Sequence, residues 1–101
     1  MTLRLYLDEA YLREFDARVV ASAAGWWALS HSAFYPGGGG QPQDRGQLAV
    51  EVRPLTVTAV REGEDGRRLW HRVGREAAAG TAVHGMLDWP YRYALMRHHA
   101  L

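Results

Sequence analysis

Residues 16–32 read DARVVASAAGWWALSHS, and this stretch decides the fold class. Two short apolar runs, residues 16–23 and 26–32, lie on either side of the dipeptide Ala24-Gly25. Short apolar runs that flank a turn signal are typical of a β-hairpin. We therefore expect the chain to be built from antiparallel strands.

The same pattern recurs along most of the chain. Further strands are predicted at residues 47–53, 55–61, 68–73 and 81–87, with turn clusters between them at residues 62–66 and 79–80. Alternating leucines at residues 3–7 predict a strand at the start, and Asp8 is expected to begin a short helical turn. Short strands at regular spacing predict an all-β fold, a small antiparallel β-barrel or sandwich.

The end of the chain carries a helix signal. Asp88 precedes Trp89-Pro90, and an Asp cap followed by Pro in the first turn predicts a helix over residues 89–101. No glycine or C-cap closes this helix, so we expect the chain to stop inside an element. Left uncovered, its apolar residues Tyr91, Ala94, Leu95 and Leu101 would face water. We therefore expect the helix to pack over the open end of the barrel or to be covered in a two-fold homodimer.

Composition limits the classes of function. A chain of 101 residues is enough for one domain. Its net charge of +1 does not mark a dedicated nucleic-acid binder, and the use of Arg without Lys is most simply a coding bias. The absence of Cys excludes disulfides, thiolate metal ligands and a Cys nucleophile. No apolar run approaches the roughly 20 residues of a membrane span, and we expect a cytoplasmic protein.

Residues 32–42 read SAFYPGGGGQP and form the most unusual segment. No Lys-Ser or Lys-Thr pair follows the glycines, so the segment is not a phosphate-binding P-loop. Four successive glycines cost conformational entropy when they are ordered. The segment is therefore either a flexible hairpin tip or a loop whose backbone closely approaches a ligand or a second domain.

Residues 32–46 resemble the glycine-rich motif of the alanyl-tRNA editing proteins AlaX and of the editing region of alanyl-tRNA synthetase. In that family a Thr or Ser precedes an AFYPGGGGQP run, and an Asp and a Gly follow it. The strings LWH at residues 69–71, DWPYR at 88–92 and MRHH at 96–99 also resemble the family. The resemblance implies that residues 1–88 form a barrel like the second domain of translation elongation factors. Residues 89–101 would begin the first helix of a missing metal-binding domain.

The resemblance implies zinc-dependent hydrolysis of Ser or Gly wrongly attached to alanine tRNA. The family holds its zinc with a His-x-x-x-His pair on that helix and a later Cys-x-x-x-His pair. Only His99 aligns with a ligand here, as a single vestigial position. We therefore expect a truncated relative that binds no zinc and is inactive alone, with a missing C-terminal half or a full-length synthetase as its partner. The alternative is a non-catalytic barrel that binds tRNA or assists a synthetase or editing partner.

Site residues follow from the same resemblance. The residues expected near the substrate are Ser32, Gly37, Gly38, Gly39, Gly40 and Gln41. In the family the hydroxyl at the position of Ser32 helps to discriminate the misattached amino acid. Arg92 and Arg97 are candidate RNA contacts, with a solvated helix surface as the plainer interpretation.

The remaining rare side chains have structural interpretations. His31, His71 and His84 lie on predicted strands and are expected to be structural rather than metal ligands. Trp26, Trp27 and Trp70 are expected in the barrel core and on its surface; stacking on RNA bases is the alternative.

Overall fold

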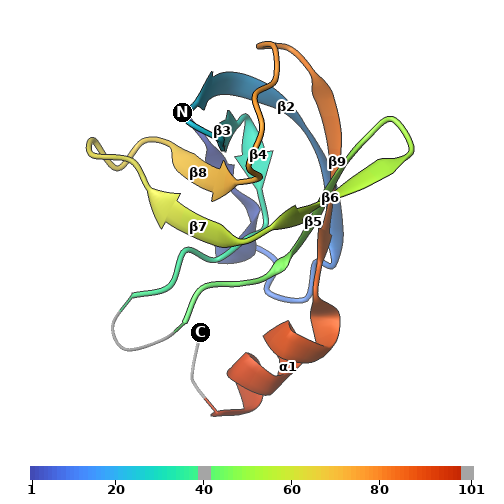
Figure 1. Cartoon of the computed structure of the whole chain (residues 1–101). Coiled ribbons are helices and arrows are strands. Elements are labelled where there is room, and N and C mark those ends of the chain that lie inside the picture. The colour runs from blue at the N-terminus through green and yellow to red at the C-terminus, as the bar shows by residue number, and fades with distance from the viewer. Residues whose placement is uncertain (39–41, 99–101) are drawn as a thin grey trace.

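The fold is a curled antiparallel sheet, seen in a computed structural model that describes residues 1–38 and 42–98. The elements are β1 (Leu3–Arg4), a 3-10 turn η1 (Leu5–Leu7), β2 (Glu14–Ala23), β3 (Trp26–Leu29), β4 (His31–Ser32), β5 (Gly46–Val50), β6 (Arg53–Val57), β7 (Ala59–Glu62), β8 (Leu69–Arg72), β9 (Ala82–Leu87) and α1 (Trp89–His98). Seven strands pair in the order β6-β5-β9-β2-β3-β8-β7 (Figure 1). The predicted all-β fold with a C-terminal helix is confirmed.

The predicted hairpin is formed by β2 and β3. Ala24 and Gly25 both have positive φ, 52° and 84°, as the tight turns that suit twisted hairpins require. Phe15, Ala17 and Val19 alternate inward along β2 and are buried. Since alternate residues of a strand face the same side, this periodicity directs one face of β2 into the core.

The strand predicted over residues 55–61 is wrong in one respect, because it breaks at Thr58. β6 pairs with β5, whereas β7 pairs with β8 at the opposite end of the sheet order. Val57 and Val60 are both buried, 2% and 1% exposed. Residues three apart cannot share one face of a straight strand. Burial of both valines therefore requires the chain to bend between β6 and β7, which curls the sheet.

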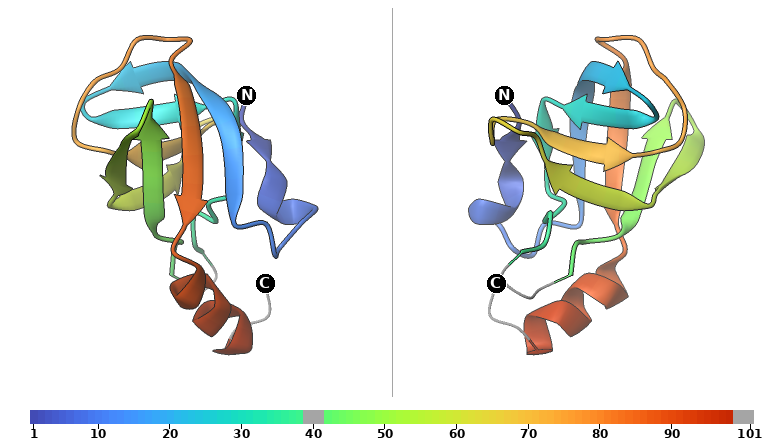
Figure 2. Two further views of the ribbon diagram at one scale, coloured as in Figure 1. Left: turned by 90° about the vertical axis from the view of Figure 1, so that its right-hand side faces the viewer. Right: turned by 60° about the vertical axis from the view of Figure 1, so that its left-hand side comes forward.

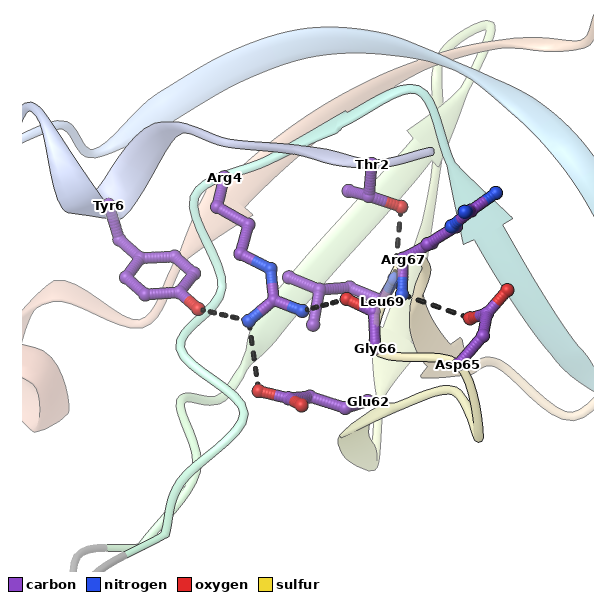
Figure 3. A network of polar contacts seen from close by, with 8 residues as sticks. All are labelled: Thr2, Arg4, Tyr6, Glu62, Asp65, Gly66, Arg67 and Leu69. Carbon is purple, nitrogen blue, oxygen red and sulfur yellow. Dashed lines mark hydrogen bonds and ion pairs between the residues drawn. The ribbon is translucent and has the colours of Figure 1, made fainter.

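The start of the chain also differs from its prediction. The strand stops after Arg4, the helical turn precedes Asp8, and Leu3 and Leu7 are exposed. Polar contacts hold this segment instead. The Thr2 hydroxyl donates to the Leu29 carbonyl at 2.6 Å, and Arg4 forms a 2.9 Å ion pair with Glu62. Figure 3 shows the side chains of Thr2 and Arg4 reaching the β7–β8 hairpin, where they contact Leu69 and Glu62.

The core lies inside the curl of the sheet. Its buried members are Phe15, Ala17, Val19, Trp27, Leu29, Ala33, Phe34, Leu48, Val57, Val60, Val83 and Leu87. They come from both halves of the strand order and from the segment that follows β4. The strands and the start of the glycine-rich segment therefore share one hydrophobic core.

Helix α1 begins where the sequence predicts. The Asp88 carboxylate accepts a hydrogen bond from the Tyr91 backbone N–H at 3.2 Å, as an N-cap does. Leu95 is 8% exposed within the single chain, which agrees with the first of the two expected arrangements, packing of the helix back against the barrel. Residues 99–101 of the predicted helix lie outside the described part of the chain. Within that part, α1 lacks the length and apolar character needed to cross a membrane.

Gly46 offers a test of this packing. A Cβ at residue 46 would collide with the Met86 carbonyl oxygen on β9 and lie 3.0 Å from the Phe34 ring. Gly46→Ala should lower the free energy of unfolding by about 3 kcal/mol, because strand β9 cannot yield without breaking its pairing. Urea denaturation measures the loss, and Gln47→Ala, at an exposed site on the same strand, is the control. Equal stability of the two variants would contradict this packing.

Candidate functional site

We call residues 32–45, from the end of β4 to the start of β5, the glycine-rich segment. The start of β5 lies beside the start of α1 (Figure 2). The two ends of the segment are tied together. The Asp44 N–H donates to the Tyr35 carbonyl at 2.9 Å, and the Tyr35 N–H donates to Asp44 Oδ2 at 2.8 Å. Gly37 and Gly38 have φ of 83° and 120°, a backbone region that favours glycine. Gly39, Gly40 and Gln41 lie outside the described residues.

Ser32 opens the segment from a fully buried position. Its Oγ lies 2.7 Å from His71 Nε2, and the Phe34 N–H donates to the same oxygen at 3.1 Å. The His71 Nδ1 atom lies 3.1 Å from the Trp27 carbonyl oxygen. A carbonyl can only accept, so Nδ1 carries the ring proton and Nε2 accepts the proton of the Ser32 hydroxyl. The hydroxyl is left with one free acceptor lone pair.

Burial keeps this histidine neutral. Loss of solvent lowers the pKa of His71 from 6.5 to about 4, and the hydrogen bond to Trp27 opposes the shift. The Phe34 ring packs edge-on against the imidazole, with the ring centres 5.4 Å apart. At neutral pH His71 therefore acts as a fixed acceptor for Ser32. The pair resembles a nucleophile and base, but it has no carboxylate behind the histidine and Ser32 is 0% exposed.

Asp44 closes the segment and binds α1. Its Oδ2 atom accepts a 2.8 Å hydrogen bond from Arg92 Nη1, and both side chains are almost fully buried. The same Nη1 atom lies 3.4 Å from the Ala33 carbonyl. Burial raises the pKa of Asp44, while the Tyr35 N–H and the Arg92 charge work in the opposite direction. A guanidinium from the helix thus touches both arms of the glycine-rich segment.

The outer side of this region carries arginines stacked on aromatic rings. The Arg45 guanidinium lies 3.7 Å from the centre of the Tyr91 ring, and the Arg13 guanidinium lies 4.6 Å from that of Trp89. Tyr11 contacts Trp89, with a centroid distance of 6.1 Å. We call these five residues the stacked patch. Cationic groups interleaved with aromatic faces can bind both phosphates and bases.

His84 and His31 also have polar partners. His84 lies 2.7 Å from Glu14 and 2.8 Å from Asp16, and the bonds to these two carboxylates raise its pKa. His31 Nδ1 lies 3.0 Å from the Ser30 hydroxyl. In residues 1–38 and 42–98, no three His, Asp or Glu side chains are grouped to hold a metal ion. His99 lies outside these ranges.

The structure places the two candidate RNA contacts differently. Arg97 is exposed, whereas the Arg92 side chain is only 2% exposed and its charge faces Asp44. Arg92 therefore offers no surface to RNA in this arrangement. Trp27 lies in the core, and Trp26 is half-buried beneath Arg61 at 4.4 Å. The partners of Ser32 and Asp44 were missed, because nothing in the sequence pairs residues 39 and 48 positions apart.

His71 makes stability depend on pH. The unfolded chain takes up a proton at His71 near pH 6.5, while the folded chain resists protonation until about pH 4. Folding stability should therefore be full above pH 6.5 and fall by roughly 3 kcal/mol as the pH drops towards 4. Urea unfolding at a series of pH values measures this loss, and His71→Gln should lack it. Identical pH slopes in the two proteins would contradict a neutral, buried His71.

No protein-family model matches the chain. It is 43% identical to an alanine–tRNA ligase of Thermococcus kodakarensis over 100 residues, 97% of this chain and 11% of the ligase. It is 40% identical to the alanyl-tRNA editing proteins AlaX-M of Saccharolobus solfataricus and Pyrococcus horikoshii, over 98% of this chain. The chain spans 43% and 44% of those two proteins. The predicted resemblance is thereby confirmed: the chain is a homologue of a region that alanine–tRNA ligases and AlaX-M editing proteins have in common.

Proposed function

We propose that the chain serves as the β-barrel part of an editing system that removes Ser or Gly wrongly attached to alanine tRNA. The observation that carries this proposal is the 40–43% identity, over nearly the whole chain, to both a tRNA ligase for alanine and proteins named for alanyl-tRNA editing. A region common to both kinds of protein fits a shared editing role better than a role in aminoacylation.

In this role the barrel positions the aminoacyl end of the tRNA. Gly37 and Gly38 present backbone without side chains, which allows a ligand to come close. The Ser32 hydroxyl gives its proton to His71, so any further partner must donate to it. A misattached serine has a hydroxyl to donate and alanine has none. Contact of Ser32 with the substrate requires its cover to move, because the residue is fully buried here.

We propose further that these 101 residues alone bind no zinc and hydrolyse no ester. A protein zinc site needs three or four ligands. The chain has no Cys, and both ring nitrogens of His71 and of His84 already have partners. His99 by itself would supply a single ligand. The chemical step then requires residues from outside the 101.

Elemental analysis and a deacylation assay test this together. After dialysis the purified chain should hold much less than one zinc per molecule, and it should release no serine from mischarged alanine tRNA. The reason is that metal-assisted hydrolysis needs an ordered site to position water. A complete AlaX-M protein is the positive control. One tightly held zinc that is lost in His99→Ala, or turnover above a heat-treated sample, would contradict the proposal.

The second candidate is a non-catalytic module that binds tRNA or an editing partner. The stacked patch favours it, because Arg45 and Arg13 lie over aromatic rings beside the glycine-rich segment. Arg97 is exposed on the adjoining helix. This candidate is compatible with the first, since a barrel that positions tRNA must also bind it. We expect either role to be carried out in the cytoplasm.

Arg45→Glu tests tRNA binding. The substitution should weaken binding of alanine tRNA several-fold, because Arg45 is 58% exposed and carries one of the positive charges of the stacked patch. The salt dependence of the binding constant should fall by the amount expected for about one phosphate contact. Fluorescence anisotropy at three salt concentrations measures both effects. Arg53→Glu, at the start of strand β6 in the β5–β6 hairpin, is the matched control and should have less effect. Equal losses in both variants would argue against the stacked patch.

Self-association through α1 stays part of the proposal in a narrower form. Leu95 is already covered within the chain, so a two-fold dimer would use the exposed side of the helix. Tyr93, 48% exposed, and Ala94 lie there.

A further inference from the structure

Asp44 and Arg92 form a buried ion pair that joins the end of the glycine-rich segment to helix α1. Arg92 Nη1 donates to Asp44 Oδ2 at 2.8 Å, and that oxygen also accepts from the Tyr35 N–H at 2.8 Å. The carboxylate therefore holds the two ends of the segment together and binds the helix with the same atom. Any movement of the helix that withdraws Arg92 breaks its hydrogen bond to Asp44 Oδ2, the atom that also accepts from the Tyr35 N–H.

The Asp44–Arg92 pair is not expected to contribute much to the stability of the fold. Among the described residues, Asp44 Oδ1 and Arg92 Nε are buried and have no hydrogen-bond partner. Buried ion pairs rarely stabilise a fold more than apolar residues of similar volume, and incomplete hydrogen bonding lowers their value further. Their best-attested use is to specify one arrangement among several. The arrangement at stake here is that of the glycine-rich segment relative to α1.

We infer that Arg92 is a positioning residue, which couples the contact between Tyr35 and Asp44 to docking of helix α1. Its importance for editing rests on the proposed function, because the segment is then the part that approaches the aminoacyl end. The coupling itself does not depend on that function. Withdrawal of Arg92 should loosen the segment, and weakening of Asp44 should loosen the helix, since coupling between two sites is reciprocal.

Arg97 provides the matched control, because it is an arginine on the same helix whose side chain is exposed. Exposed charges contribute little to stability, because water and salt screen them. Arg97→Met should therefore change amide exchange in the segment and in the helix by less than about threefold.

Hydrogen exchange of single amides in the 101-residue chain tests the coupling. Arg92→Met should speed exchange at Tyr35 and Asp44 by about tenfold to a hundredfold, and Asp44→Asn should speed exchange within residues 93–97 by about tenfold. Amides in the β2–β9 pairing should keep their protection. Arg92→Lys should restore part of the protection, because it keeps the charge but offers a smaller set of donors.

A double variant distinguishes the coupling from a general loss of stability. Asp44→Leu combined with Arg92→Met removes both charges, so it should fold and still show fast exchange in both the segment and the helix. Wild-type protection there in this double variant would overturn the inference. Equal acceleration at all strand amides, or loss of the fold in Asp44→Asn, would overturn it too. Alanine tRNA binding is measured in parallel: its absence would count against the proposed function and leave the exchange result standing.

Discussion

The Asp44 carboxylate is the point at which the sheet, the glycine-rich segment and helix α1 meet. A carboxylate that is only 1% exposed needs a cationic partner, and Arg92 supplies it from the helix. This requirement fixes the rotation of α1. Leu95 lies three residues further along, on the same face of the helix, and is buried as well. The ion pair of Arg92 with Asp44 therefore sets the orientation of the helix in which Leu95 is also buried within the chain.

A second buried polar network holds the opposite end of the segment. It is a chain of three hydrogen bonds that joins the Phe34 N–H, the Ser32 hydroxyl, the His71 ring and the Trp27 carbonyl. The donor and the acceptor of each bond are fixed. Such networks are costly when a member is unsatisfied, so they select a single arrangement of the backbone. With Asp44 at one end and Ser32 at the other, the glycines lie between two fixed ends.

Local patterns predicted those elements that local chemistry controls. The β2–β3 hairpin follows from Gly25 and the apolar runs, and α1 follows from its Asp88 cap. Residues 3–7 and 55–61 were predicted less well, because the contacts of Arg4 and the bend at Thr58 depend on partners far along the chain. The site shows the same division. The motif identified Ser32 and Asp44 as members of one segment, but periodicity cannot predict which buried group pairs with which.

Arg92 and Arg97 lie on the same short helix, but only Arg92 is buried, because the two side chains lie on different sides of the helix. A charged residue on a short helix is ordinarily solvated, and the sequence offers no sign that residue 92 differs from residue 97. The structure gives the two arginines different environments. The inner pair with Asp44 is shielded from salt, whereas Arg45 and the stacked patch on the outer side lie within reach of counterions. A rise in ionic strength therefore weakens the charge contacts of the outer surface and leaves the inner contact, and with it the position of α1, unchanged.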